Sequence, residues 1–166
     1  MNKMMRRGMF LALFIFILSL RVAGAAGSLG MSGKEQKKAP DFSLETVAGK
    51  TVALKDLNGQ GAIMFFFTSW CPYCRQKLPL LSQEYPTYQK EDVRLVAVDA
   101  GESKAKVSSF ATKEKLPFDV LLDIDMKVAE AYGVIGVPTF VLISKGGAVV
   151  YQGNELPRNY KELLAQ

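Results

Sequence analysis

Residues 61–78 of this 166-residue chain read GAIMFFFTSWCPYCRQKL, and this stretch decides the fold. Residues 62–67 form an apolar run without alternation, which is typical of a strand buried on both faces of a mainly parallel sheet. Over residues 72–88, apolar side chains recur at helical spacing, so a helix is expected. Cys71 and Cys74, the only two cysteines in the chain, therefore lie where a buried strand gives way to a helix.

Strands and helices alternate on both sides of this stretch. Before it, residues 41–44 and 51–54 are strand-like pieces that suggest a hairpin. After it we expect strands at 93–98, 118–122, 139–143 and 148–151, and helices at 103–113, 126–132 and 156–164. Pro79 is predicted to kink the helix that follows the cysteines, and Pro86 to bend or end it. The alternation predicts an α/β fold with a central mixed β-sheet flanked by helices.

The composition excludes several kinds of site. The chain has no histidine, which rules out a Ser-His-Asp triad, a Cys-His protease pair, an HExxH zinc site and a haem bound through histidine. Apolar residues make up 49% and charged residues 22%, as expected for a folded domain.

The N-terminal segment has the layout of a secretory signal peptide. A basic head precedes an uncharged apolar run over residues 9–20, and Ala23 and Ala25 follow with the spacing of a cleavage site. The alternative is an uncleaved membrane anchor. The predicted organisation is a signal peptide over 1–25, a flexible linker over 26–39 and one domain over 40–166.

Export also explains the net charge of +5. Removing residues 1–25 takes away four basic and no acidic residues and leaves a net charge of +1. The remaining chain has no basic stripe interleaved with aromatic residues, so nucleic-acid binding is not expected. The destination of an exported chain is the periplasm or another extracytoplasmic space.

The two cysteines form a Cys-Pro-Tyr-Cys motif at the start of the expected helix. Unpaired N–H groups and the helix dipole stabilise a thiolate at that position, and the thiolate is the reactive form of cysteine. Pro72 fits the first turn, where its missing N–H costs nothing. The favoured chemistry is dithiol–disulfide exchange. A structural disulfide, a metal site shared in a dimer and two unreactive cysteines are the alternatives, and no metal or cofactor is expected.

Three features together resemble a known family. The sequence WCPYC follows a hydrophobic strand, Pro79 comes five residues after the second cysteine, and residues 136–139 read GVPT before a late strand. These resemble a thioredoxin-fold protein. Residues 40–57, PDFSLETVAGKTVALKDL, make the chain similar to the exported TlpA/ResA-like thiol:disulfide oxidoreductases of the redoxin, or AhpC/TSA, group.

The resemblance implies a thioredoxin-like fold with an N-terminal β-hairpin and an inserted βα element. It implies that Cys71 is an exposed nucleophile, that Cys74 is a buried resolving thiol and that Pro138 is a cis proline facing the pair. The residues expected to contact substrate are Trp70, Pro72, Tyr73, Val137 and Pro138. Trp70 is interpreted as a lid over the disulfide, with ordinary core packing as the alternative.

In this family the usual reaction is reduction of disulfides in exported proteins, often for maturation of c-type cytochromes. The implied partners are those substrates and a membrane reductase of the DsbD/CcdA kind. A thiol peroxidase is the first alternative, since Thr68 and Cys71 match half of a peroxiredoxin motif. Met64 stands where that motif has proline. A non-catalytic binding module is the second alternative.

The chain departs from its relatives at the proton acceptor for the second thiol. The strand before the motif contains no acid, and Lys77 stands where many ResA-like proteins have glutamate. Asp99 is a substitute candidate, with a strand-end cap or turn residue as the alternative interpretation. Arg75 and Lys77 are close to the thiols in a helix, and we expect them to tune the redox potential by favouring the thiolate.

Overall fold

The structure is a computed structural model that describes residues 37–57 and 59–166. The chain divides into two units, Met1–Ser32 and Gly33–Gln166. The expected signal peptide and most of the expected linker lie outside the described residues. The elements of the second unit are β1 (Ser43–Glu45), β2 (Thr51–Ala53), η1 (Leu54–Leu57), β3 (Gly61–Phe67), α1 (Pro72–Lys90), β4 (Val93–Ala100), α2 (Lys104–Glu114), β5 (Asp119–Asp123), α3 (Lys127–Ala131), β6 (Thr139–Ile143), β7 (Val149–Gly153) and α4 (Tyr160–Leu164).

The central sheet is mixed, with strand order β5-β4-β3-β6-β7. β3 pairs in parallel with β4 and antiparallel with β6, and β4 pairs in parallel with β5. Every residue of β3 is buried, which explains why its sequence is apolar without alternation. The sequence correctly predicted this strand, the mixed sheet and the hairpin of β6 and β7. β5, which follows α2, is an edge strand of the sheet.

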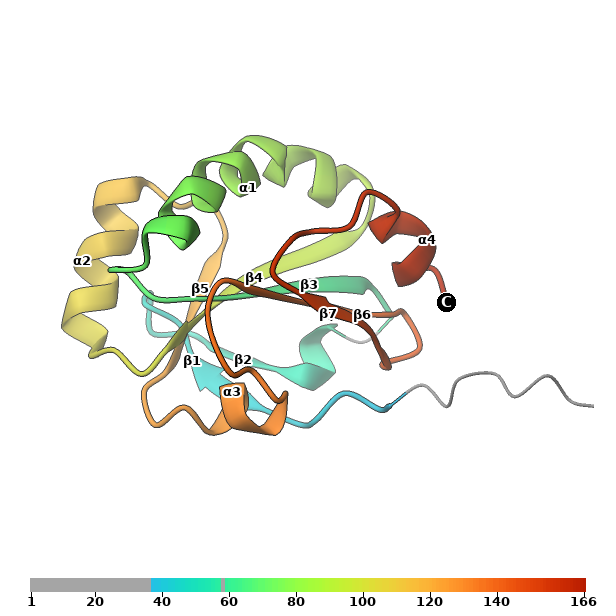
Figure 1. The fold of residues 1–166 in the computed structure, drawn as a ribbon, viewed down its shortest axis with the longest axis horizontal. Coiled ribbons are helices and arrows are strands. Elements are labelled where there is room, and N and C mark those ends of the chain that lie inside the picture. The colour runs from blue at the N-terminus through green and yellow to red at the C-terminus, as the bar shows by residue number, and fades with distance from the viewer. Residues whose placement is uncertain (1–36, 58) are drawn as a thin grey trace, which may run out of the picture. The chain divides into compact units, whose positions relative to one another are not determined.

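Both faces of the sheet are covered by other elements (Figure 1). α1, α2 and α4 pack on one face, where Leu78, Val107 and Leu164 join one core cluster. The β1–β2 hairpin and α3 pack on the other, where Val52 and Val128 join a second cluster. Because β3 contributes side chains to both clusters, its C-terminal end is fixed from both sides. The cysteine motif begins four residues after that end.

The first described residues are part of the domain. Lys38 forms an antiparallel bridge with Ala148, and Val149 N–H donates to the Lys37 carbonyl at 2.8 Å. Ala39 is buried. Residues 37–39, expected in the linker, are instead held by backbone pairing beside β7, which a sequence without periodicity does not reveal.

Two helices have other bounds than the sequence predicts. α1 continues through Pro79 and Pro86 to Lys90, so Pro86 does not end it. The kink at Pro79 stays a prediction. α4 is shorter than predicted, because Leu156 reaches the core from the preceding loop and the helix begins only at Tyr160. Within the described residues, no helix has both the length and the apolar character needed to cross a bilayer.

Candidate active site

Cys71 is the N-cap residue of α1. Its backbone is extended, with φ −72° and ψ 116°, and Pro72 is the first helical residue. The Cys74 N–H donates to Cys71 Sγ at 3.3 Å. The sulfur therefore occupies the position of an N-cap oxygen, with a free helix N–H directed at it. This geometry stabilises negative charge on Cys71 at the moment of attack.

Cys74 lies one turn further on and is completely buried. Burial, followed by the hydrogen bond to Cys71, raises the pKa of the Cys74 thiol to about 12. Cys74 therefore stays protonated at neutral pH. It was expected to be buried, whereas Cys71 was expected to be exposed and is only 4% exposed. The expectation for Cys71 is wrong because the cap position places its sulfur beneath the segment before β6.

The segment before β6 faces the cysteine pair. The Val137–Pro138 peptide bond is cis, as the resemblance implied. The Cys71 thiol donates to the Val137 carbonyl oxygen at 3.7 Å. Cys71 and Val137 are 66 positions apart in the sequence, so only the fold brings the helix start and this loop together.

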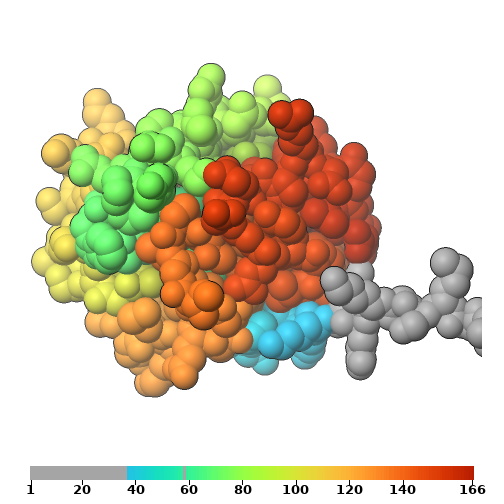
Figure 2. All heavy atoms as spheres, in the orientation of Figure 1, coloured from blue at the N-terminus to red at the C-terminus, as the bar shows by residue number. Residues whose placement is uncertain are grey.

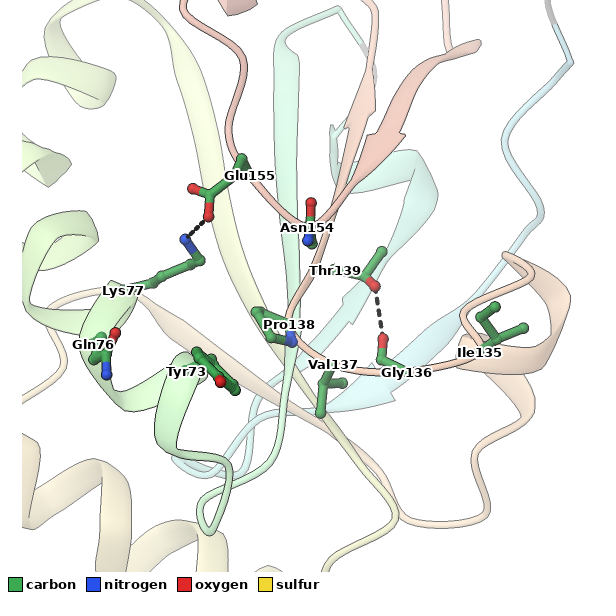
Figure 3. A pocket seen from close by; sticks show the side chains of 10 residues that line it. All are labelled: Tyr73, Gln76, Lys77, Ile135, Gly136, Val137, Pro138, Thr139, Asn154 and Glu155. Atoms are coloured by element: carbon green, nitrogen blue, oxygen red, sulfur yellow. Dashed lines mark hydrogen bonds and ion pairs between the residues drawn. The ribbon is translucent and has the colours of Figure 1, made fainter.

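A groove of about 500 Å³ runs beside this contact. Tyr73, Gln76 and Lys77 of α1 form one wall, the segment 135–139 forms the other, and Asn154 and Glu155 close one end (Figure 3). Green atoms of α1, orange atoms before β6 and red atoms after β7 meet on the face shown in Figure 2. The groove places Tyr73, Val137 and Pro138, three of the five expected substrate-binding residues, along one open channel.

Apolar residues beside Cys71 and along the groove are open to solvent. Trp70 is 65% exposed, Tyr73 is 66% exposed and Ile135 is fully exposed. Trp70 is therefore not an ordinary core residue. Pro72 is exposed as well. Exposed aromatic and aliphatic side chains beside a nearly buried thiol suit contact with another polypeptide.

The sequence and the fold were compared with known proteins. Residues 36–152 match the AhpC/TSA family. The chain belongs to the AhpC/TSA family. It is 33% identical over 162 residues to the thiol-disulfide oxidoreductase ResA of Bacillus cereus, covering 92% of this chain and 94% of the relative.

Solved structures agree with this family assignment. StoA from Bacillus subtilis superposes with a TM-score of 0.64 at 27% identity, covering 75% of this chain and 96% of StoA. A secreted disulfide oxidoreductase of Mycobacterium tuberculosis, described as homologous to E. coli DsbE, superposes with a TM-score of 0.62 at 28% identity. That match covers 74% of this chain and 91% of the other. This AhpC/TSA family member is a thioredoxin-fold enzyme, a thiol:disulfide oxidoreductase.

The two cations expected to tune the thiols are engaged elsewhere in this family member. Lys77 Nζ contacts Glu155 Oε1 at 2.5 Å across the groove, and Arg75 lies 3.9 Å from Glu114. Burial and the hydrogen bond to Cys71 are the largest causes of the shifted pKa of Cys74. Redox tuning by Arg75 and Lys77 stays a prediction, and these carboxylates partly compensate the charge on which it depends.

The sequence interpretation missed two residues at the site, Glu102 and Ser69. Glu102, after β4, is 7% exposed and accepts hydrogen bonds from both the N–H and the hydroxyl of Ser69. Asp99 Oδ1 accepts a hydrogen bond from the Glu102 N–H at 3.0 Å. This confirms the alternative interpretation of Asp99 as a strand-end cap. A signal was available, because the carboxyl ends of adjacent parallel strands meet at one edge of a sheet. An acidic residue just after the strand expected at 93–98 could therefore be placed beside the cysteine motif, which follows the neighbouring strand.

Proposed function

We propose that this enzyme is exported and that it reduces disulfides of exported proteins with its Cys71–Cys74 dithiol. The observation that carries the proposal is the placement of Cys71. Its sulfur receives a helix N–H from Cys74 and lies 3.7 Å from the Val137 carbonyl, beside an open groove. A substrate segment in the groove would bring its own disulfide to that sulfur.

The reaction is two successive thiol–disulfide exchanges. The Cys71 thiolate attacks one sulfur of the substrate disulfide, and the other substrate sulfur leaves as a thiolate. Cys74 then loses its proton and attacks Cys71 Sγ, which breaks the mixed disulfide and releases the second substrate thiol. The substrate gains two electrons and two protons, and the enzyme is left with a Cys71–Cys74 disulfide.

The contrast between the two thiols supports these roles. Burial raises the pKa of Cys74 to about 12, which makes it a poor first nucleophile at neutral pH because the thiolate is the attacking form. Cys71 holds the N-cap position, and its sulfur contacts Val137, which lines the groove. Trp70, Pro72 and Tyr73 are exposed around it and would contact the substrate together with the segment at Pro138.

The cellular setting is proposed from the sequence and the relatives. The basic head and apolar run of residues 1–25 support export to the periplasm or another extracytoplasmic space, and one solved relative is described as secreted. Electrons would come from a membrane reductase of the DsbD/CcdA kind. Maturation of c-type cytochromes is the proposed pathway, because it is the usual role of ResA-like proteins.

Cysteine variants test the roles directly. Cys71→Ser should abolish reduction of insulin in the presence of dithiothreitol. Cys74→Ser should accumulate a mixed disulfide that is visible on a non-reducing gel. The chain has no other cysteine, so each variant leaves a single thiol and the trapped bond is unambiguous. Trapping by Cys71→Ser, or insulin reduction by Cys71→Ser, would contradict the assignment.

A further inference from the structure

A buried pair of carboxyl groups lies behind the loop that carries Cys71. Asp99 is completely buried at the end of β4, and Glu102 is 7% exposed three residues later. Neither takes part in the two exchange steps described above. Two acids this deeply buried need a structural or chemical reason, because burial of ionised carboxylates is costly unless they are paired and hydrogen-bonded.

Glu102 holds the loop before the motif. Its Oε2 accepts the Ser69 N–H at 2.5 Å, and its Oε1 accepts the Ser69 hydroxyl at 2.9 Å. Lys106 Nζ adds an ion pair to Oε1 at 2.5 Å. Ser69 is two residues before Cys71, whose own N–H donates to the carbonyl of Thr68 at 3.2 Å. The ionised carboxylate of Glu102 therefore fixes the segment from which the Cys71 sulfur is presented.

Asp99 has a different hydrogen-bonding pattern. Its Oδ1 accepts the Glu102 N–H, but its buried Oδ2 receives no hydrogen bond from any described residue. Both side chains are buried, and the carboxylate of Glu102 is already bound to Ser69 and Lys106. A buried carboxylate oxygen without a donor disfavours the charged form of its group. Oδ2 is therefore the natural place for a proton on Asp99.

Few charged groups lie near the Asp99 carboxyl group. Across the sheet Asp99 is in register with Phe67 of β3 and Leu122 of β5, both apolar. The charged neighbours are Glu102 and, from α2, Lys106. α1 covers the same face and begins with the two cysteines. Burial, reinforced by Glu102, raises the pKa of Asp99 to about 8. Burial also acts to raise the pKa of Glu102, but the contacts of its carboxylate with Lys106 and Ser69 help to hold that pKa well below its usual range.

We propose that Asp99 is a positioning residue for disulfide exchange, because a proton kept on Asp99 leaves Glu102 as the only charged member of the pair, free to stay ionised on Ser69 and to hold the Cys71 loop. This inference rests on the proposed function. When Asp99 ionises, the pair carries a second negative charge, and Asp99 Oδ2 has no hydrogen-bond donor among the described residues to stabilise it. Repulsion between the two carboxylates then loosens the hold of Glu102 on Ser69, and Cys71 is presented less well to the substrate.

The first test compares the pH profile of insulin reduction in the wild type and in Asp99→Asn. The wild-type kcat/KM should bend downward near pH 8, because Asp99 loses its proton there. The ratio of kcat/KM at high pH to that at low pH should be about threefold higher in Asp99→Asn, equivalent to one weakened hydrogen bond. An Asp99→Asn profile with the same bend would overturn the proposal.

Asp123→Asn is the matched control. Asp123 is also completely buried at the end of a strand, but both of its oxygens accept helix N–H groups, from Val128 and Ala129. This variant should keep the wild-type pH profile. Loss of the bend in Asp123→Asn as well would show that the bend reports general loosening of the fold, and would overturn the assignment to Asp99.

Infrared spectroscopy provides a readout that does not need activity. At neutral pH the wild type should show the carbonyl band of a protonated carboxylic acid, and the band should disappear in Asp99→Asn and remain in Asp123→Asn. Absence of the band in the wild type would refute the proton on Asp99 even if insulin is reduced. A protein with the band that cannot reduce insulin would instead refute the proposed function.

Discussion

Replacing Asp99 with Asn should remove a pH dependence from the stability of the fold. Burial raises the pKa of Asp99 from 3.8 to about 8, so the folded chain keeps a proton that the unfolded chain releases near pH 4. A carboxyl group with a raised pKa contributes most to stability below its unfolded pKa. That contribution is lost as the pH rises toward the folded value. The wild type should therefore become less stable between about pH 4 and about pH 8.

The size of the effect follows from proton linkage. One proton retained only by the folded state lowers the free energy of unfolding by at most about 1.4 kcal/mol per pH unit. Over the window from about pH 5 to about pH 7.5 the loss should reach about 2–3 kcal/mol. The chain has no histidine, so the side chain that most often titrates in this window is absent. The lowered pKa of Glu102 changes the free energy of unfolding only below about pH 4.5, which lies outside this window.

Urea unfolding of the reduced protein, followed by circular dichroism at several pH values in this window, measures the slope. Asp99→Asn should flatten it to under about 0.3 kcal/mol per pH unit, because an amide stays uncharged. Asp123→Asn should lower stability at every pH and keep the slope, because its carboxylate caps α3 through two N–H groups. A wild-type stability that does not change across the window would refute the reasoning.

Three further predictions address the export signal, the redox potential and the core. Mass spectrometry of the exported protein should show a mature start near Ala26, and a product that keeps its first residue would indicate an anchor. Equilibration with glutathione buffers should give a potential between about −270 mV and about −120 mV, the values of thioredoxin and DsbA. Lys77→Glu should move it in the reducing direction, and no movement would show that the pairing with Glu155 already cancels the charge. Gly61→Ala should cost about 1–3 kcal/mol on urea unfolding by overpacking, because an added Cβ would lie 2.7 Å from Leu164 Cβ. Gly136→Ala, where an added Cβ meets nothing within 4 Å, is its control.

Local patterns in the sequence were enough to predict most of the fold. The uninterrupted apolar run of β3, the motif at the start of α1 and the glycines between β6 and β7 each depend on neighbouring residues. The end of α3 at Gly133, which has φ 69°, is another such case. A sequence reports these features because backbone conformation and the burial of one face are set within a few residues.

Two features of the fold depend on segments far away in the chain, and local sequence patterns did not predict them. Leu156 packs into the core from a loop, so α4 begins later than its helical pattern indicated. Residues 37–39 are fixed by pairing beside β7. These contacts join residues far apart in the chain, and no local pattern encodes the partner.

The redox chemistry can be inferred from the amino-acid sequence, because two cysteines separated by two residues at a helix start have few other uses in a chain without histidine. The environment of those thiols depends on the three-dimensional fold. The fold buries Cys71 beneath Val137, directs Lys77 to Glu155 instead of to the sulfurs, and places the Asp99–Glu102 pair behind the loop. The reason is physical: a residue type fixes which proton or charge a side chain can carry. The pKa and the hydrogen-bond partner of that side chain depend on solvent exclusion and on groups brought from other strands.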